Sequence, residues 1–384
     1  MSSGVAVLAE CYCAEPESVT KVLVFDCPSY DAAGPLVEQA FEVLAPPLEG
    51  KRVLIKPNIL GPCRPEEHVT THPALVRAAV EACRRRGAAE IVVGDNPGMT
   101  AYGTTEHAAR TAGIVDAADG CYRNIAELPR AVRGATPRMD SLPVARAVLD
   151  ADVIVNLPKM KTHVATGMTG AVKNTFGYVV GAAKTRLHAL YPGAEAFARA
   201  VLDVFAVRPP ELSIMDAVWA MEGQGPSGGR PRFVGRLLAS ADAVALDAVA
   251  ARMMGFAPGD VPLLVAAGKR GLGETRLEAI EVAGPADPID GFRRPVVGRA
   301  VGTFLARTMS RLFVTQPRPD KDMCVRCGAC AQGCPVDAIR MDPFPEIDAD
   351  LCISCFCCHE FCRYKAMKLA RRVRFWKFLR GAST

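Results

Sequence analysis

Short, almost wholly apolar runs alternate with amphipathic stretches along roughly the first 290 residues of the chain. The apolar runs predict strands at Val22–Asp26, Arg52–Lys56, Glu90–Gly94, Val153–Leu157, Leu212–Asp216 and Glu278–Val282. The stretches between them predict helices at Leu36–Leu44, Pro73–Arg86, Thr104–Ala112, Ala194–Phe205 and Ala243–Met254. Strands that are covered on both faces are apolar throughout, and strand–helix alternation is typical of a parallel sheet. The pattern therefore predicts an α/β fold with a mostly parallel sheet flanked by helices.

The pattern breaks in a proline- and arginine-containing stretch from Pro285 to Pro295. We expect a large domain over residues 1–290, a basic bridging segment over 291–318, a small α+β domain over 319–370 and a basic tail over 371–384. In the bridging segment the apolar residues fall on one side of a helix and the arginines on the other. This helix either packs on the large domain or lies on a membrane surface.

Eight cysteines near the C-terminus form two quartets with the spacing C-x2-C-x2-C-x3-C. They are Cys324, Cys327, Cys330 and Cys334, followed by Cys352, Cys355, Cys358 and Cys362. This run resembles that of bacterial two-cluster ferredoxins, in which the fourth thiolate of each quartet binds the other cluster. We therefore expect a ferredoxin-like domain with two [4Fe–4S] clusters, with Cys334 and Cys362 exchanged between them. The alternative is a pair of zinc knuckles, which usually use two cysteine pairs or mixed Cys/His ligands.

The net charge of +5 conceals an asymmetry. Residues 1–292 carry 29 basic and 33 acidic residues. Arg293–Arg318 holds six arginines and Arg363–Thr384 holds eight basic residues, and neither block contains an acid. Such blocks are typical of solvated tails or of surfaces that bind acidic partners. We expect a redox partner protein or a small anionic substrate, no nucleic acid, and peripheral membrane contact through the basic tail as an alternative.

The sequence gives no sign of membrane insertion or secretion. No apolar run reaches the roughly 18 residues that a membrane-spanning helix needs. Met1–Glu10 lacks the basic flank and the long apolar stretch of a secretory signal. The cysteines outside the quartets are scattered along a long chain, so we expect reduced thiols and a cytoplasmic protein. These cysteines are Cys11, Cys13, Cys27, Cys63, Cys83, Cys121 and Cys357.

Lysines and asparagines gather at the ends of two predicted strands. Arg52–Lys56 continues into Pro57 and Asn58, and Val153–Leu157, which contains Asn156, continues into Pro158–His163. An acid-free stretch then supplies Gly170, Lys173, Asn174, Gly177, Lys184 and His188. Because ligands of open α/β sheets bind beyond the carboxyl ends of the strands, this pattern predicts a site for an anionic ligand. Neither a P-loop nor a G-x-G-x-x-G turn after a strand is present, so a dinucleotide site is not indicated.

Several of these segments together resemble the DUF362 domain, a family named for its unknown function. They are Val53–Asn58, Gly94–Gly98, Asn156–His163, Gly170–Gly177, Lys184 with His188, Met221–Gly229, and Ala241-Asp242 with Leu246-Asp247. The resemblance covers about residues 20–285, and its most specific parts are Asn156–His163 and Lys173-Asn174-x-x-Gly177. It implies an iron–sulfur protein, since a fused two-cluster ferredoxin is a common arrangement in that family.

The leading hypothesis is an iron–sulfur oxidoreductase that passes single, low-potential electrons to a substrate or cofactor in this crevice. The catalytic candidates are Lys161, His163, Lys173, Asn174 and His188, and the substrate-binding candidates are Lys56, Asn58, Asn156, Lys184 and Glu222. Lysines would stabilise developing negative charge, and histidines would donate protons. One alternative is an electron carrier whose large domain docks a partner enzyme. Another is a non-redox enzyme on an anionic substrate, with clusters that are structural. The dense Lys/Asn/His set favours a substrate site.

Overall fold

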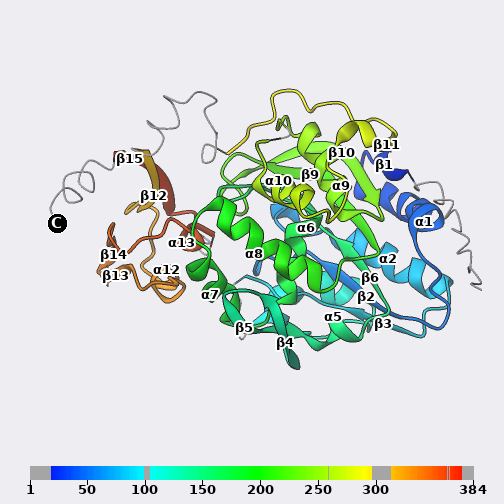
Figure 1. Cartoon of the computed structure of the whole chain (residues 1–384), viewed down its shortest axis with the longest axis horizontal. Helices are drawn as coiled ribbons and strands as arrows, with labels where there is room; N and C mark the ends of the chain where they lie inside the picture. The colour runs from blue at the N-terminus through cyan, green and yellow to red at the C-terminus, as the bar shows by residue number, and fades with distance from the viewer. Residues whose placement is uncertain are drawn as a thin grey trace, which may run out of the picture.

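The computed structural model describes residues 19–98, 104–257, 259–295, 313–360, 362 and 364–373. They form a large α/β part and a small module that lies at one end of it (Figure 1). Most of the predicted bridging segment and most of the predicted basic tail lie outside the described residues. The expected domain boundaries and the bridging helix therefore stay predictions.

The large part is built on one mixed sheet with the strand order β11-β1-β10-β9-β6-β2-β3, to which β7 and β8 are added beside β9. The strands are β1 (Thr20–Asp26), β2 (Arg52–Pro57), β3 (Glu90–Val93), β6 (Val153–Leu157), β7 (Lys159–His163), β8 (Gly167–Thr169), β9 (Leu212–Glu222), β10 (Arg230–Ser240) and β11 (Ile280–Ala283). Strands β9, β6, β2 and β3 are parallel, whereas β10 runs antiparallel to β1 and β9. All strands except β10 and β8 therefore end at one carboxyl edge.

Helices cover both faces of the sheet (Figure 1). One face packs on α1 (Ala33–Leu44), α2 (Pro73–Arg85), α3 (Thr105–Thr111) and α4 (Ile114–Ala117), and the other on α8 (Ala194–Val207), α9 (Ala243–Met253) and α10 (Pro262–Lys269). Each face has its own hydrophobic core. Val53 and Ile55 belong to the core beneath α1 to α4, and Leu54 belongs to the core beneath α8 to α10. Because neighbouring residues of a strand face opposite sides, β2 is apolar on both.

Short elements complete the large part. They are the hairpin of β4 (Pro129–Thr136) and β5 (Met139–Ala145), the helices α5 (Arg146–Asp150), α6 (Ala171–Asn174) and α7 (Ala183–Leu190), and the 3-10 turns η1 (Tyr30–Ala32), η2 (Pro65–Glu67), η4 (Thr175–Tyr178) and η5 (Leu277–Ala279). Local signals fix several starts. The Asp242 carboxylate accepts hydrogen bonds from Val244 N at 2.7 Å and Ala245 N at 3.0 Å and so caps α9.

The module contains two antiparallel strand pairs, β12 (Phe313–Pro319) with β15 (Met367–Val373) and β13 (Ile339–Asp342) with β14 (Phe344–Ile347). Its short helices are α12 (Ala329–Gln332) and α13 (Cys357–Glu360). Each helix carries cysteines of one quartet or lies next to them. Among the described residues, no helix is both long enough and apolar enough to cross a membrane.

The predicted fold class is confirmed. Each strand and helix predicted for the large part is present, β6 with the expected ends and the others with ends that shift by a few residues. The strand predicted at Leu212–Asp216 is longer than expected. Strand β9 continues to Glu222, and the segment that follows forms the turn of a β9–β10 hairpin. Strand β10 escaped prediction because Arg230, Arg232 and Arg236 interrupt its apolar positions.

Candidate functional site: a lysine–asparagine pocket beside a thiol-rich module

A pocket lies at the carboxyl edge of the sheet, where β2, β3 and β6 end. It contains about 680 Å³ of space, part of which is open solvent. Its lining comes from the loops after β2 and β3, from β7 and β8, from the helices that follow, and from the module. The lining residues are Asn58, Ile59, Leu60, Asp95, Asn96, Gly98, Lys161, Thr169, Lys173, Asn174, Phe176, Gly177, Lys184, His188, Pro226 and Cys357.

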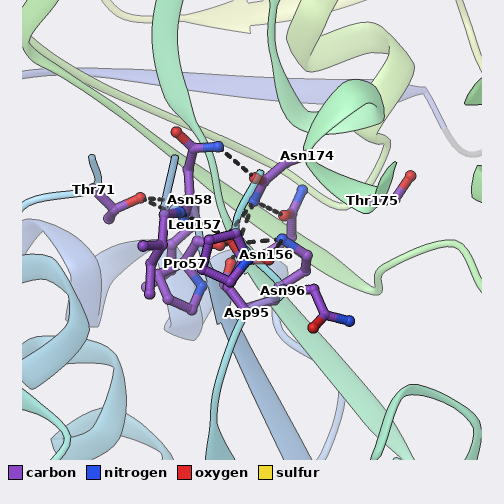
Figure 2. Close-up of polar contacts among 12 residues, drawn as sticks. Pro57, Asn58, Thr71, Asp95, Asn96, Asn156, Leu157, Asn174 and Thr175 are labelled. Atoms are coloured by element: carbon purple, nitrogen blue, oxygen red, sulfur yellow. Dashed lines mark hydrogen bonds and ion pairs between the residues drawn. The ribbon is translucent and has the colours of Figure 1, made fainter. Parts of the chain in front are cut away.

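A chain of side-chain hydrogen bonds crosses the floor of the pocket (Figure 2). Lys161 Nζ donates to Asn58 Oδ1 at 2.7 Å, and Asn58 Nδ2 donates to Asn174 Oδ1 at 3.0 Å. Asn174 Nδ2 in turn donates to Asn156 Oδ1 at 2.8 Å. An ammonium group can only donate, so Lys161 fixes which way each amide in the chain points. Asn156 ends the chain by donating to Ser213 Oγ and to the carbonyl of Ala171.

A buried ion pair lies directly behind this floor. Lys56 Nζ and Asp95 Oδ1 are 2.6 Å apart, and their side chains are 0% and 3% exposed. Burial lowers the pKa of Lys56, and the carboxylate of Asp95 opposes that shift. Gly177 lies against the pair, because a Cβ atom there would be 2.3 Å from Asp95 Oδ1 and 2.8 Å from Lys56 Nζ. This contact explains the glycine in Lys173-Asn174-x-x-Gly177.

Lys184 and His188, one turn apart on α7, form another wall of the pocket. Lys184 Nζ donates to the carbonyl oxygens of Asn96 at 2.6 Å and Pro97 at 3.0 Å. Burial lowers the pKa of Lys184 to about 7, with Lys56 and Lys173 adding to the shift and Asp95 opposing it. The ring of His188 stacks on Phe197 with centroids 4.0 Å apart. The pocket therefore holds a lysine that changes its charge near neutral pH.

The small module closes one side of the pocket. Cys357, the first residue of α13, lines it together with Pro226 from the β9–β10 turn. His359 Nδ1 lies 2.6 Å from the carbonyl oxygen of Met367, and its Nε2 lies 3.2 Å from that of Gln224. A Cβ atom on Gly228 would come within 2.9 Å of the His359 ring, so glycine permits this close approach. Helix α13 thus packs directly on the β9–β10 turn.

The eight predicted ligand thiols surround two cavities of the module. One cavity is lined by Cys324, Cys327, Cys330 and Cys362. The other is lined by Cys334, Cys352, Cys355 and Cys358. Each cavity thus takes three thiols from one quartet and the last thiol of the other, which is the exchanged arrangement expected from the spacing. In the part of the chain that the structure describes, no three His, Cys, Asp or Glu side chains converge as ligands of a single ion.

The structure brings six of the ten predicted large-domain site residues to the pocket lining: Asn58, Lys161, Lys173, Asn174, Lys184 and His188. Lys56 and Asn156 lie just behind it, in the ion pair and in the amide chain. The other two, His163 and Glu222, are absent from the lining.

The expectation that His163 shares the pocket with Lys161 is not met. His163 lies at the β7–β8 turn, where its Nδ1 accepts from Ala165 N at 3.1 Å. Glu222 also turns elsewhere, since its Oε2 accepts from Arg293 N at 3.1 Å. Both residues sit where a strand ends in a turn, and backbone N–H groups hold their side chains, a local one for His163 and a distant one for Glu222.

Sequence reasoning missed a second buried network at the same edge. Lys159 Nζ lies 2.8 Å from Asp216 Oδ2 with both side chains fully buried, and it donates to Tyr30 Oη at 3.0 Å. Asp216 Oδ2 also accepts from His72 N at 3.0 Å. Burial lowers the pKa of Lys159 and raises that of Tyr30. Nothing in the basic motif around Lys159 indicated that this lysine forms an ion pair. Asp216 lies beside it only because of the register between β7 and β9.

The fold and the thiol cavities define an α/β domain joined to a ferredoxin-type module. Residues 53–252 match the model of DUF362, described as a domain of unknown function, and residues 317–340 match that of the 4Fe–4S binding domain. The chain belongs to the DUF362 family, and the second match supports [4Fe–4S] binding and an iron–sulfur electron-transfer role.

The chain is also similar to a curated relative and to a solved structure. The thylakoid-associated protein sll1697 of Synechocystis sp. is 33% identical over 270 residues, which are 69% of this chain and 82% of that protein. A solved Thermotoga maritima protein is similar with a TM-score of 0.34 and 15% identity, over 57% of each chain.

Proposed function

We propose that this protein is an iron–sulfur oxidoreductase that exchanges single electrons with a small anionic ligand held in the lysine–asparagine pocket. One observation carries the proposal. Cys357 lines the pocket, and the next residue in the chain is Cys358, one of the thiols around the second cavity. A ligand beside Lys161 and Lys173 is therefore next to the peptide that joins the two cysteines.

The pocket residues have distinct parts in this proposal. Lys161 and Lys173 supply positive charge for the anion, and the fixed amides of Asn58 and Asn174 orient it. The ammonium group of Lys184 donates two of its three N–H groups to backbone carbonyls, and the third can donate to the ligand. With a pKa of about 7, Lys184 is suited to hand over or retain a proton near neutral pH. The module covers one side and limits access of water.

The two thiol cavities fit two [4Fe–4S] clusters, because four cysteine ligands surround each in the bacterial ferredoxin arrangement. Such clusters supply one-electron chemistry over a wide range of potentials. The residues that would hold them are the first three thiols of each quartet with the last thiol of the other.

The test starts from protein purified without oxygen and reduced with dithionite. We expect about eight iron atoms per chain and re-oxidation by some members of a panel of small carboxylates that bear a reducible C=C, C=O or N–O group. Lys173→Ala should slow that re-oxidation by about 100-fold or more, as expected when an interaction with the developing charge is lost. Lys173 is only half-buried, so its variant should keep the iron content and melting temperature.

Lys269→Ala is the matched control, because Lys269 is exposed at the end of α10, away from the pocket. It should behave as the unmodified protein. Equal re-oxidation rates for the Lys173 and Lys269 variants would show that the pocket takes no part in the reaction. Stoichiometric zinc in place of iron would remove the redox function itself. Lys161→Ala is a less suitable variant for this test, since Lys161 is fully buried and holds Asn58.

A further inference from the structure

The two thiol cavities of the module have different surroundings. The second faces the large domain: Cys358 is buried, and the adjacent Cys357 lines the pocket. The first is open to solvent at Cys327, which is exposed. The described residues that line either cavity belong to the module, so the difference lies in these thiols. One cavity is therefore turned inwards and the other outwards.

Exposed apolar side chains lie around the outward cavity. Val325 and Tyr364 line it and are 53% and 42% exposed. Met323, next to Cys324 in sequence, is 42% exposed. Single exposed apolar side chains are normal, but several at one opening mark an interaction surface. We call Met323, Val325 and Tyr364 the apolar rim.

Positive charge is concentrated in the same half of the module. Segments 313–333 and 362–373, which supply most of the outward cavity, together contain eight basic and two acidic residues. Segment 334–361, which supplies most of the inward cavity, contains one basic and six acidic residues. The halves of the module thus carry opposite charge.

The fold brings the basic residues of the outward half together. Pairing of β12 with β15 places Arg318 opposite Lys368. Lys321 Nζ and Arg326 Cζ lie 5.5 Å and 5.6 Å from the centroid of one ring, that of Phe344. The two acidic residues of this half are Asp320 and Asp322, and the Asp320 carboxylate accepts from two backbone N–H groups of its own turn. The cations are left to attract a partner.

We propose that the apolar rim and the basic residues Lys321, Arg326 and Lys368 form the docking surface for an acidic electron-carrier protein. Charge complementarity selects the partner, since an apolar centre within a basic border fits an apolar patch within an acidic one. The place of the surface points the same way, because a carrier bound there lies next to the exposed Cys327. Three apolar side chains with three cations suit the small interfaces of transient redox complexes.

This proposal is tested by binding, so it does not depend on which ligand the pocket takes. The probes are two acidic carriers, a flavodoxin and a plant-type [2Fe–2S] ferredoxin, titrated calorimetrically into the cluster-loaded protein at about 50 mM salt. We expect binding of at least one carrier, and Lys321→Glu with Lys368→Glu should weaken it about tenfold or more. Raising the salt to about 0.5 M should abolish most of that difference.

The matched control is Lys51→Glu with Lys269→Glu, which changes the net charge equally on exposed residues of the large domain. Met323→Ser is compared with Leu351→Ser, which removes an apolar side chain that is 53% exposed but lies in the acidic half. The control variants should bind as the unmodified protein does. The proposal would be overturned if both lysine-pair variants weakened binding equally, or if neither carrier bound. It would also be overturned if the protein bound anionic lipid vesicles, or associated with itself, and the Lys321/Lys368 variant alone abolished that binding or association.

Discussion

The protein concentrates positive charge in two regions that are built in opposite ways. In and just behind the pocket, Lys56, Lys161 and Lys184 are buried, and each donates to a carboxylate, an amide or a carbonyl oxygen. On the module, Lys321 and Lys368 are exposed. The first region has side chains in fixed positions with little contact with water, and the second has side chains that are exposed to water.

This difference predicts which kind of ligand each region takes. Buried charges interact strongly with a small ion that displaces water, but their own charge is costly and their pKa values shift. Exposed charges keep their usual protonation, act over roughly a Debye length, and mainly accelerate the encounter with a large partner. A small anion in the pocket and a protein on the module follow from the same physics.

The largest effect that separates the two regions concerns stability. Lys56→Met leaves Asp95 buried without its partner, and this should destabilise the fold by about 3–5 kcal/mol. Arg340→Gln removes an ion pair whose side chains are 76% and 56% exposed, and this should cost less than about 1 kcal/mol. Urea unfolding under anaerobic conditions measures both. Adding Asp95→Asn to Lys56→Met should recover part of the loss. A similar cost for the two single variants would contradict the comparison.

The sequence predicted the module better than the pocket for a physical reason. The thiols of each quartet lie within ten residues, so their spacing alone limits what they can surround. Pocket residues come from the ends of several strands, and only the strand order brings Asn58, Lys161 and Lys184 together. The rule that parallel strands end at one edge was enough to predict that a site exists there.

The errors in the site have the same origin. His163 and Lys161 are two residues apart on one strand, so alternation places them on the same face. A turn follows His163, however, and turns the side chain to a local N–H donor. No pattern in the sequence linked Cys357 or Pro226 to the pocket, because their approach depends on how α13 rests on the β9–β10 turn.

An intermediate effect concerns pH. In the folded protein, Lys184 is charged only below its pKa of about 7. Sulfate keeps a constant charge from about pH 5 to 9, so it serves as the probe. Above about pH 7 the pocket should bind sulfate up to tenfold more weakly per pH unit. Lys184→Met should bind more weakly at low pH and lose this dependence. His188→Gln tests whether the neighbouring imidazole is responsible instead. In the unfolded chain the lysine stays protonated up to the ordinary pKa of 10.5, so this group also makes stability rise from about pH 7 to 10.5.

The smallest expected effect is the response of the pocket to salt. Lys161 and Lys184 are buried and Lys173 is half-buried, so screening by mobile ions reaches the pocket poorly. Between about 50 and 200 mM salt, the concentration of carboxylate that gives half-maximal re-oxidation should change by less than about threefold. Over the same range the affinity of the module for an acidic carrier should fall severalfold, since exposed charges are screened beyond roughly a Debye length. Both are measured on one preparation in the salt of a large organic anion, because a small anion such as chloride or sulfate would compete in the pocket. A pocket that loses affinity as steeply as the module does would mean that its lysines act as exposed charges, and the distinction between the two regions would fail.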